Sequence, residues 1–270
     1  MIILRNKLKS IQTNYNWNTF SVIFCREFVR MKNEPSRLIG SLIQPLMFWF
    51  VIGSGFVSTF SIQESNSLDY LSFFYPGILI MVILFSAIFS TITVIEDRQL
   101  GFLQGVLVGP GSRYSLVLGK VLGISSISLL QALLFFALAP VIGVNLSQAN
   151  WVITFIILFL GAFGLSSLGF IFAWISESSA IYHALMSIIL IPLWILSGCM
   201  FPTQNGWISK ASLINPIAWF TSALRASLNN GIAPLGTVNT FLTLNVSFLL
   251  LLSFAFIMIF IAIFICNWRR

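Results

Sequence analysis

Apolar residues along this chain gather into long runs separated by short polar stretches. Six runs are long enough to cross a hydrocarbon core of about 30 Å, which takes roughly 20 helical residues. They are Leu38–Phe60, Leu71–Ile95, Leu116–Val141, Trp151–Ile175, His183–Phe201 and Phe241–Cys266. Runs such as ILIMVILFSAIF lack the alternation of a membrane β-strand, and a helix satisfies its own backbone hydrogen bonds in lipid. The pattern therefore predicts an all-α integral membrane protein with six transmembrane helices.

A seventh helical pattern, Asn16–Pro35, precedes the first run. Its aromatic residues recur at spacings of three and four, which places them on one helix face: Trp17, Phe20, Phe24 and Phe28. Arg26 and Arg30 fall mostly on another face. A basic helix with an aromatic face is typical of the membrane interface, so we expect an N-terminal interfacial helix in contact with lipid. The alternative is a cytosolic helix packed on protein.

The connection between the last two runs, residues 202–240, is unusually long. Within it, Ile217–Leu228 has a helical pattern that ends at Asn-Gly. Non-spanning backbone at membrane depth needs protein around it. We therefore expect short re-entrant helices on the outer side, or else a surface cap with no transport role.

Charge is scarce and unevenly placed. Only 8% of residues are charged, against roughly 25% in soluble domains. The net charge of +7 comes largely from basic residues before the first run, which indicates a membrane surface and no nucleic acid as partner. Basic loops stay in the cytoplasm. Both termini are therefore expected there, with residues 1–37 as a cytoplasmic N-terminal region and 38–270 as the six-span domain.

The chain lacks the residues of a catalytic or metal site. Gly119-Lys120 resembles the end of a phosphate-binding loop, but Tyr114 and Val121 occupy positions that need Gly and Ser or Thr. One histidine and three scattered cysteines do not provide a zinc site. We therefore expect no enzyme activity, no metal and no cofactor bound by this chain.

Polar residues inside the runs are few and uncharged near the centre of each run. An ion-driven carrier usually has ionisable groups there, so the pattern favours energy supplied from outside the chain. The candidates for lining a substrate path are Gln44, Phe48, Gln131 and Asn215. The alternative for the polar ones is a hydrogen bond to a neighbouring helix. Small residues at Gly119, Gly123, Gly161, Gly164, Ser166 and Gly169 predict close helix approach.

The loop from Glu96 to Ser115 is unusually apolar for a cytoplasmic connection. Leu100, Leu103 and Leu107 precede a Gly-Pro-Gly turn around Pro110. Exposed apolar surface of this extent is unfavourable in water. A partner protein that buries these leucines in a groove would remove the cost. The alternative is that the loop folds back on the chain's own helices.

This loop resembles the coupling segment of type-2 ABC exporter membrane subunits, the group that includes daunorubicin-resistance permeases. The residues that match, in order, are Glu96, Arg98, Gly101, Leu103, Leu107, Pro110, Ser112, Arg113, Gly119 and Lys120. Further matches are Gln44-Pro45, Tyr75-Pro76-Gly77, Asn215-Pro216 and Ala223-Leu224-Arg225. The resemblance runs from about Trp17 to the end of the printed sequence.

The resemblance implies a permease dimer on two separate ABC ATPase subunits, which would hold ATP and Mg²⁺. It implies an ATPase-coupling role for Glu96, Arg98, Leu100, Gly101, Leu103, Leu107, Pro110 and Arg113. The expected location is the inner (plasma) membrane. The expected activity is export of a hydrophobic or amphiphilic substrate, drug-like or lipid-linked. A secondary carrier or channel that works without an ATPase is the alternative.

Overall fold

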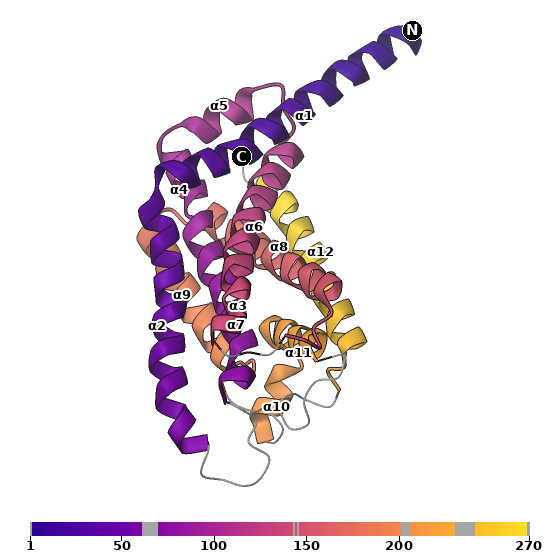
Figure 1. The fold of residues 1–270 in the computed structure, drawn as a ribbon. Coiled ribbons are helices and arrows are strands. Elements are labelled where there is room, and N and C mark those ends of the chain that lie inside the picture. Colours follow the sequence, from indigo (N-terminus) through magenta and orange to yellow (C-terminus); the bar gives the residue numbers. More distant parts are fainter. Residues whose placement is uncertain are drawn as a thin grey trace.

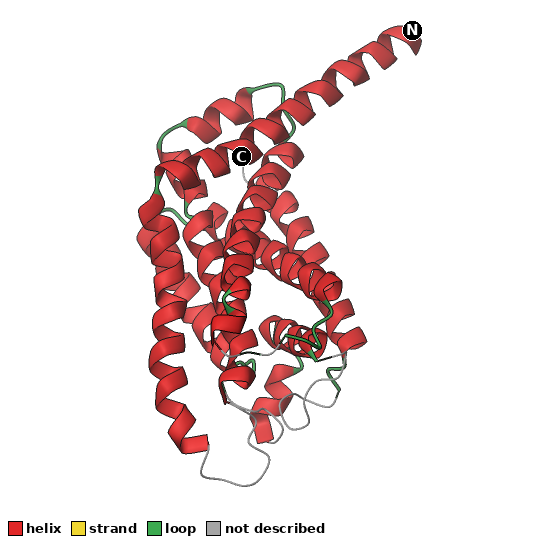
Figure 2. Ribbon diagram, viewed as in Figure 1, coloured by secondary structure: helices red, strands yellow, loops and turns green. Residues whose placement is uncertain are grey.

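The computed structural model describes residues 2–60, 70–142, 144, 146–200, 206–229 and 241–268. Side chains are described for 14–51, 73–140, 144, 146–200, 207–229 and 241–268. These parts of the chain form twelve helices and no strand (Figure 2). The long helices are α1 (Ile2–Asn33), α2 (Pro35–Phe60), α3 (Tyr70–Thr91), α6 (Arg113–Ala137), α8 (Trp151–Ile175), α9 (Ser179–Ile195) and α12 (Leu244–Trp268). The short ones are α4 (Thr93–Gln99), α5 (Phe102–Val108), α7 (Ala139–Ile142), α10 (Gly206–Ser212) and α11 (Pro216–Leu228). The predicted helical class is therefore confirmed.

Four segments of the described chain are long and apolar enough to span a membrane. They are Phe73–Gln99, Arg113–Ala137, Trp151–Ile175 and Leu244–Trp268. The first, α3 with α4, lies at the centre of the bundle, since 94% of its most apolar stretch is buried, against 28% for α12. These segments correspond to four of the six predicted spans.

The fifth predicted span has different bounds from those expected. The helix there, α9, begins at Ser179 rather than His183, because Ser178 caps it by accepting a hydrogen bond from the backbone of Ile181. It ends at Ile195, before Gly198 with its φ of +80°. Seventeen residues rise about 25 Å, slightly less than a typical hydrocarbon core. The C-terminal limit that we predicted, Phe201, lies outside the described residues.

Helix α8 packs against three other helices, and a glycine lies at each of these contacts. A Cβ added at Gly161 would overlap the Phe220 ring of α11, and one at Gly164 would meet Phe254 of α12. A Cβ at Gly169 would lie 2.8 Å from the hydroxyl of Thr91 in α3. The predicted close approach along this helix is confirmed, and each glycine serves a different neighbour.

The two ends of the bundle differ (Figure 1). At one end, α1 crosses the ends of the long helices and α5 lies beside it. We call this the α5 end. The last turn of α12 lies there too, because the Arg113 guanidinium at the start of α6 donates to the carbonyls of Cys266 and Asn267 at 3.1 and 3.0 Å. Helices α10 and α11 lie at the opposite end.

The predicted outer region is described in part. Helix α11 matches the expected Ile217–Leu228 within one residue, and Asn215 caps it as its side-chain oxygen accepts from the backbone of Ile217 at 2.9 Å. Residues 202–205 and 230–240, which the prediction of re-entrant helices also covers, lie outside the described residues.

Candidate functional site

The N-terminal helix α1 packs tightly on α6 at the α5 end. A Cβ at Gly119 would lie 2.9 Å from the backbone oxygen of Phe20, and one at Gly123 would lie 2.9 Å from the Glu27 side chain. The facing stripe of α1 is buried at Ile23 and Glu27, which are 3% and 2% exposed. The predicted close approach at these two glycines is therefore confirmed, and its partner is α1.

The predicted aromatic residues of α1 form a continuous ladder beside that stripe. Ring centroids are 5.4 Å apart for Trp17 and Phe20, 5.9 Å for Phe20 and Phe24, and 5.2 Å for Phe24 and Phe28. Trp17 is exposed and the three phenylalanines are half-buried. The four residues thus share one flank of the helix, as their spacing predicted.

The opposite flank of α1 is basic and binds α4. The Arg26 guanidinium donates to both carboxylate oxygens of Asp97 at 2.7 Å, and its carbon lies 3.8 Å from the centre of the Phe102 ring. Such bidentate pairs are among the stronger hydrogen bonds in proteins. Arg26 therefore links α1 to α4 and to the first residue of α5.

Arg30 continues this flank one turn later. It donates to Asp97 at 2.9 Å, to Glu96 at 2.8 Å and to Glu34 at 3.2 Å. Burial disfavours the charged guanidinium, but the neighbouring carboxylates, Asp97 foremost, outweigh it and raise the pKa of Arg30 above its ordinary value. Arg30 stays charged and joins three acidic residues.

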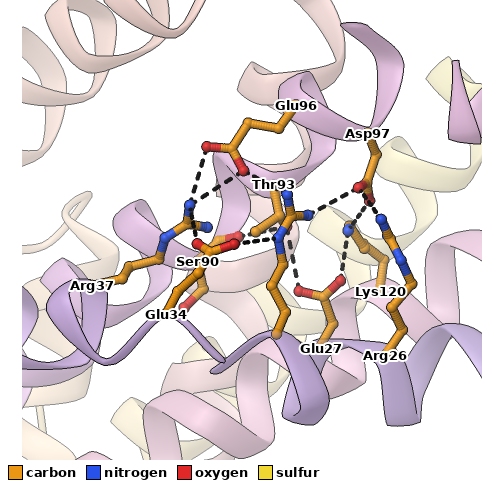
Figure 3. A network of polar contacts seen from close by, with 10 residues as sticks. Arg26, Glu27, Glu34, Arg37, Ser90, Thr93, Glu96, Asp97 and Lys120 are labelled. Atoms are coloured by element: carbon orange, nitrogen blue, oxygen red, sulfur yellow. Dashed lines mark hydrogen bonds and ion pairs between the residues drawn. The ribbon is translucent and has the colours of Figure 1, made fainter. Parts of the chain in front are cut away.

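Beneath this flank, Lys120 of α6 is buried between two carboxylates (Figure 3). Its ammonium group pairs with Glu27 of α1 at 2.6 Å and with Asp97 of α4. Thr93 donates to the second oxygen of Glu27 at 3.3 Å. All three charged side chains are 2% exposed or less. Separating buried charges from their partners costs several kcal/mol, so α1, α4 and α6 are held together here.

Arg37 adds helix α2 to the cluster. It pairs with Glu34 at 2.7 Å and with Glu96 at 3.1 Å. We call the eight ionised residues the charged junction: Arg26, Glu27, Arg30, Glu34, Arg37, Glu96, Asp97 and Lys120. Its four cations balance its four anions, so it is neutral as a whole.

Sequence reasoning found only part of this junction. It singled out Arg26, Arg30 and Glu96, and it named Lys120 in two motif comparisons without predicting a charge pair. It gave no role to Glu27. A usable signal existed: Glu27 lies four residues after Ile23 on the buried stripe, where an acid needs a buried cation as partner.

Arg98, expected in the coupling segment, faces the bundle instead of a partner. It donates to the carbonyls of Ala173, Trp174 and Ser176 at 2.8, 3.1 and 2.7 Å. These carbonyls end α8, where a cation also complements the helix dipole. After Arg98 the chain turns at Gly101, whose φ of +76° favours glycine.

The predicted leucines around α5 differ sharply in exposure. Leu103 is 4% exposed and Leu107 is half-buried, both packed within this chain. The expectation that a partner buries Leu103 is therefore corrected, because the chain's own core already covers it. Leu100 and Val108 are 76% and 89% exposed, and Pro110 beyond them is also exposed. The most exposed apolar residues of this segment are therefore Leu100, two residues before α5, and Val108, the last residue of α5.

The candidate path residues lie on α2 and α6 and at the start of α11. Gln131 is buried, and its oxygen accepts a hydrogen bond from the Ser41 hydroxyl of α2 at 3.0 Å. Phe48 packs edge-on against Trp194 of α9, with centroids 6.1 Å apart. Gln44 is half-buried on α2. Of these, Gln131 lies beside a cavity next to the charged junction.

Asn215 is a structural residue rather than a path residue. Besides capping α11, it donates to the carbonyl of Leu193 at 2.6 Å. Both polar ends of its side chain are thereby used, and the residue is 4% exposed. The prediction that Asn215 lines a path is corrected on this ground.

Known proteins are similar to this chain over a segment that includes the charged junction and α5. The family model described as ABC-2 type transporter matches residues 18–229. The putative transport permease ycf38 of Cyanophora paradoxa is 26% identical over 226 residues, covering 82% of this chain and 78% of the relative. The protein of the same name from Porphyra purpurea is 25% identical over 214 residues, covering 76% and 72%. The probable multidrug ABC transporter permease YbhR of Escherichia coli K12 is 28% identical over 166 residues, covering 57% and 43%. The family match contains the whole charged junction and α5.

Proposed function

Because this chain belongs to the ABC-2 type transporter family, as a multi-pass membrane permease subunit, we propose that it is the membrane part of an ATP-driven exporter. Permeases of this family are the non-catalytic subunits. In the proposal, a separate ABC ATPase subunit binds and hydrolyses ATP with Mg²⁺. The observation that carries it is the exposed apolar surface of Leu100 and Val108, on a segment fixed to the bundle by charge pairs.

The ATPase subunit docks on α5 in this proposal. Leu100 and Val108 supply the apolar contact, since they are the exposed members of the segment. Leu103 and Leu107 anchor α5 from the inside, and Gly101 and Pro110 set its direction. Such a short helix fits a groove on the partner, as amphipathic helices do elsewhere.

Motion of α5 then passes into the bundle through the charged junction. Arg26 lies over the Phe102 ring and donates hydrogen bonds to Asp97, which also pairs with Lys120 of α6. A second link lies at the far end of α5, where the backbone of Ser112 donates to Asn16 of α1 at 2.9 Å. Arg98 and Arg113 extend the coupling to the ends of α8 and α12.

We place the α5 end in the cytoplasm of the cell, at the inner (plasma) membrane. The N-terminal region 1–37 then lies inside, with the ladder of α1 against the lipid interface. Helices α2 and α9 complete six spans, α10 and α11 are re-entrant on the outer side, and both termini are cytoplasmic. The excess of basic residues before α2 supports this orientation.

The exporter works as a homodimer in this proposal, with α2 and α9 at the seam. Apolar side chains on both helices are exposed in the single chain, among them Phe50 and Ile188 at 66% and 71%. A hydrophobic or amphiphilic substrate, drug-like or lipid-linked, suits spans lined by Phe, Leu and Ile.

Co-purification tests the proposed docking. Tagged permease is expressed together with a candidate ABC ATPase subunit from the same organism, and the eluate is probed for that subunit. The double variant Leu100→Asp with Val108→Asp should lose the ATPase, because two charges would enter an apolar contact. The matched control is Ile214→Asp, an exposed apolar residue (81%) in the turn between α10 and α11 at the opposite end. If the ATPase subunit co-elutes equally with both variants, α5 is not its docking site. Substrate flux through the permease without any ATPase would favour a carrier or channel.

A further inference from the structure

The segment formed by α3 and α4 is interrupted at a buried point, residues 90–93, which we call the α3–α4 joint. Helix α3 ends at Thr91, and α4 begins at Thr93. In the first turn of α4, the backbone of Ile95 donates to the carbonyl of Ile92, three residues earlier, at 2.9 Å. A tightened turn of this kind within a long helix often marks a hinge. Because α4 carries part of the charged junction, movement of the junction relative to α3 passes through this joint.

On one side, the joint contacts a tyrosine of α9. The phenol oxygen of Tyr182 lies 3.2 Å from the Ile88 carbonyl and also hydrogen-bonds to the Thr91 hydroxyl. Thr91 donates its own proton to the Ala87 carbonyl at 2.7 Å, so Tyr182 is the donor in these contacts. Tyr182 and Thr91 are both fully buried. A hydroxyl that loses its partner here therefore stays unpaired, which is unfavourable.

On the opposite side, the joint contacts the charged junction (Figure 3). The Thr93 hydroxyl lies 2.7 Å from the Ser90 carbonyl and 3.3 Å from a carboxylate oxygen of Glu27. Glu27 is in turn paired with Lys120 of α6. Residues two apart on a helix point in nearly opposite directions. Thr91 and Thr93 thus connect the joint to α9 and to the junction, respectively.

Helix α9 is held by a narrow contact that starts at Tyr182. Its buried residues recur at every fourth position, and they are Tyr182, Met186, Leu190 and Trp194. Ile181 and Ile188 on the remaining surface are 48% and 71% exposed. Beyond the joint, Arg98 of α4 donates to the carbonyl of Ser176, three residues before α9. The start of α9 is therefore linked to the chain at both ends of α4, and so narrowly attached a helix can follow α4 as a unit.

We propose that Tyr182 is a positioning residue that passes movement of α4 to α9, through the hydrogen bonds between its hydroxyl and the α3–α4 joint. The inference rests on the proposed function, in which the ATPase moves α5 and α9 lies at the seam of the dimer. A shift of α4 then reaches the seam along α9. Packed side chains and hydrogen-bond networks carry coupling of this kind between distant sites.

The first measurement uses the permease alone, in lipid nanodiscs, and follows backbone hydrogen exchange by mass spectrometry. Tyr182→Phe keeps the ring and removes only the hydroxyl. It should speed exchange in the α3–α4 joint and at the start of α9, since the two lose their hydrogen bonds to each other. The matched control is Tyr75→Phe. Tyr75 is also fully buried and its hydroxyl donates to the Phe136 carbonyl at 3.2 Å, but it lies near the opposite end of α3.

The second measurement adds the ABC ATPase, in vesicles, and gives the ratio of amphiphilic dye molecules moved to ATP molecules hydrolysed. Tyr182→Phe and Thr91→Val should each lower this ratio roughly fivefold, the equivalent of one lost hydrogen bond. The double variant should lower it no further, because the two hydroxyls share one contact. Tyr75→Phe should leave the ratio unchanged. A variant that is only less stable loses both activities together, so the ratio separates positioning from stability.

Two results would overturn the assignment. One is a ratio for Tyr182→Phe equal to that of Tyr75→Phe, and the other is unchanged exchange in the joint when the Tyr182 hydroxyl is removed. Thr91→Val provides the same test if Tyr182→Phe does not fold. If the unaltered proteins move no dye with ATP, the proposed function is contradicted instead. The exchange measurement on the permease alone then still decides whether Tyr182 holds the joint.

Discussion

Lys120 has the most demanding environment of any residue in the charged junction. It is 2% exposed, and its ammonium group is the cation that Glu27 and Asp97 share. Removing that group leaves two carboxylates buried close together in a region of low polarity. The penalty comes from the charges that remain rather than from the pair that is lost.

We therefore predict that Lys120→Met destabilises the fold by about 3–5 kcal/mol. The measurement is thermal unfolding of the purified permease in detergent. Lys210→Met is the matched control, because Lys210 is exposed at the opposite end of the bundle, and it should change stability by less than about 0.5 kcal/mol. Equal stability of the two variants would mean that the buried ammonium group is not needed.

Two leucines of the coupling segment lead to opposite predictions. Leu103→Asp should lower the stability of the isolated permease by several kcal/mol, since it buries an unpaired charge. Leu100→Asp should leave that stability unchanged, because Leu100 is 76% exposed. Thermal unfolding without the ATPase separates the two variants. A stable Leu103→Asp chain would contradict the burial described above.

At the residue scale, the sequence predicted which side chains share a helix face better than it predicted which distant side chains pair. The spacing of the aromatic residues on α1 was enough to place them on one face, and in the structure each ring lies next to the following one. Pairings between distant residues, such as Glu27 with Lys120, depend on how α1 lies across α6. No local pattern in the sequence encodes that crossing.

Helix α1 is held rigidly at the α5 end because it is in close contact with α6. A Cβ added at Gly119 would lie only 2.9 Å from the backbone oxygen of Phe20. A backbone atom cannot move aside as the tip of a flexible side chain can, so a larger residue must push the two helices apart. The charged junction would be strained by the same movement, since α1 supplies Arg26, Glu27 and Arg30.

We predict that Gly119→Ala destabilises the permease by about 1–3 kcal/mol through overpacking and makes α1 more accessible to protease. Gly40→Ala on α2 is the control, as a Cβ there meets nothing within 4 Å. Limited proteolysis followed by mass spectrometry detects cleavage within α1. Identical digestion of the two variants would show that α1 is not held at this contact.

The elements themselves were largely predictable. An apolar run predicted both ends of α8 to the residue, and a helical pattern ended by Asn-Gly predicted those of α11 within one residue. The errors arose where capping rather than hydropathy decides a boundary, as at Ser178 before α9. Likewise, the apolar residues of α5 pointed to a partner, but which of them the chain itself covers depends on tertiary packing.

At the scale of the whole molecule, the helices are joined by many charge contacts at the α5 end. Helices α1, α2, α4 and α6 meet in the charged junction there, and Arg98 and Arg113 attach the ends of α8 and α12. A force applied to α5 would therefore reach α1, α2, α6, α8 and α12 through these contacts. This arrangement suits the proposed coupling to an ATPase, and family membership shows that the chain is an ABC transporter membrane subunit.

The most direct measurement is substrate export by vesicles that contain the permease with or without its ABC ATPase. The account predicts ATP-dependent movement of an amphiphilic dye when both proteins are present, and none with the permease alone. The variant Leu100→Asp with Val108→Asp should abolish that movement while the permease remains folded. Dye movement by the permease alone, or full activity of this variant, would contradict the account.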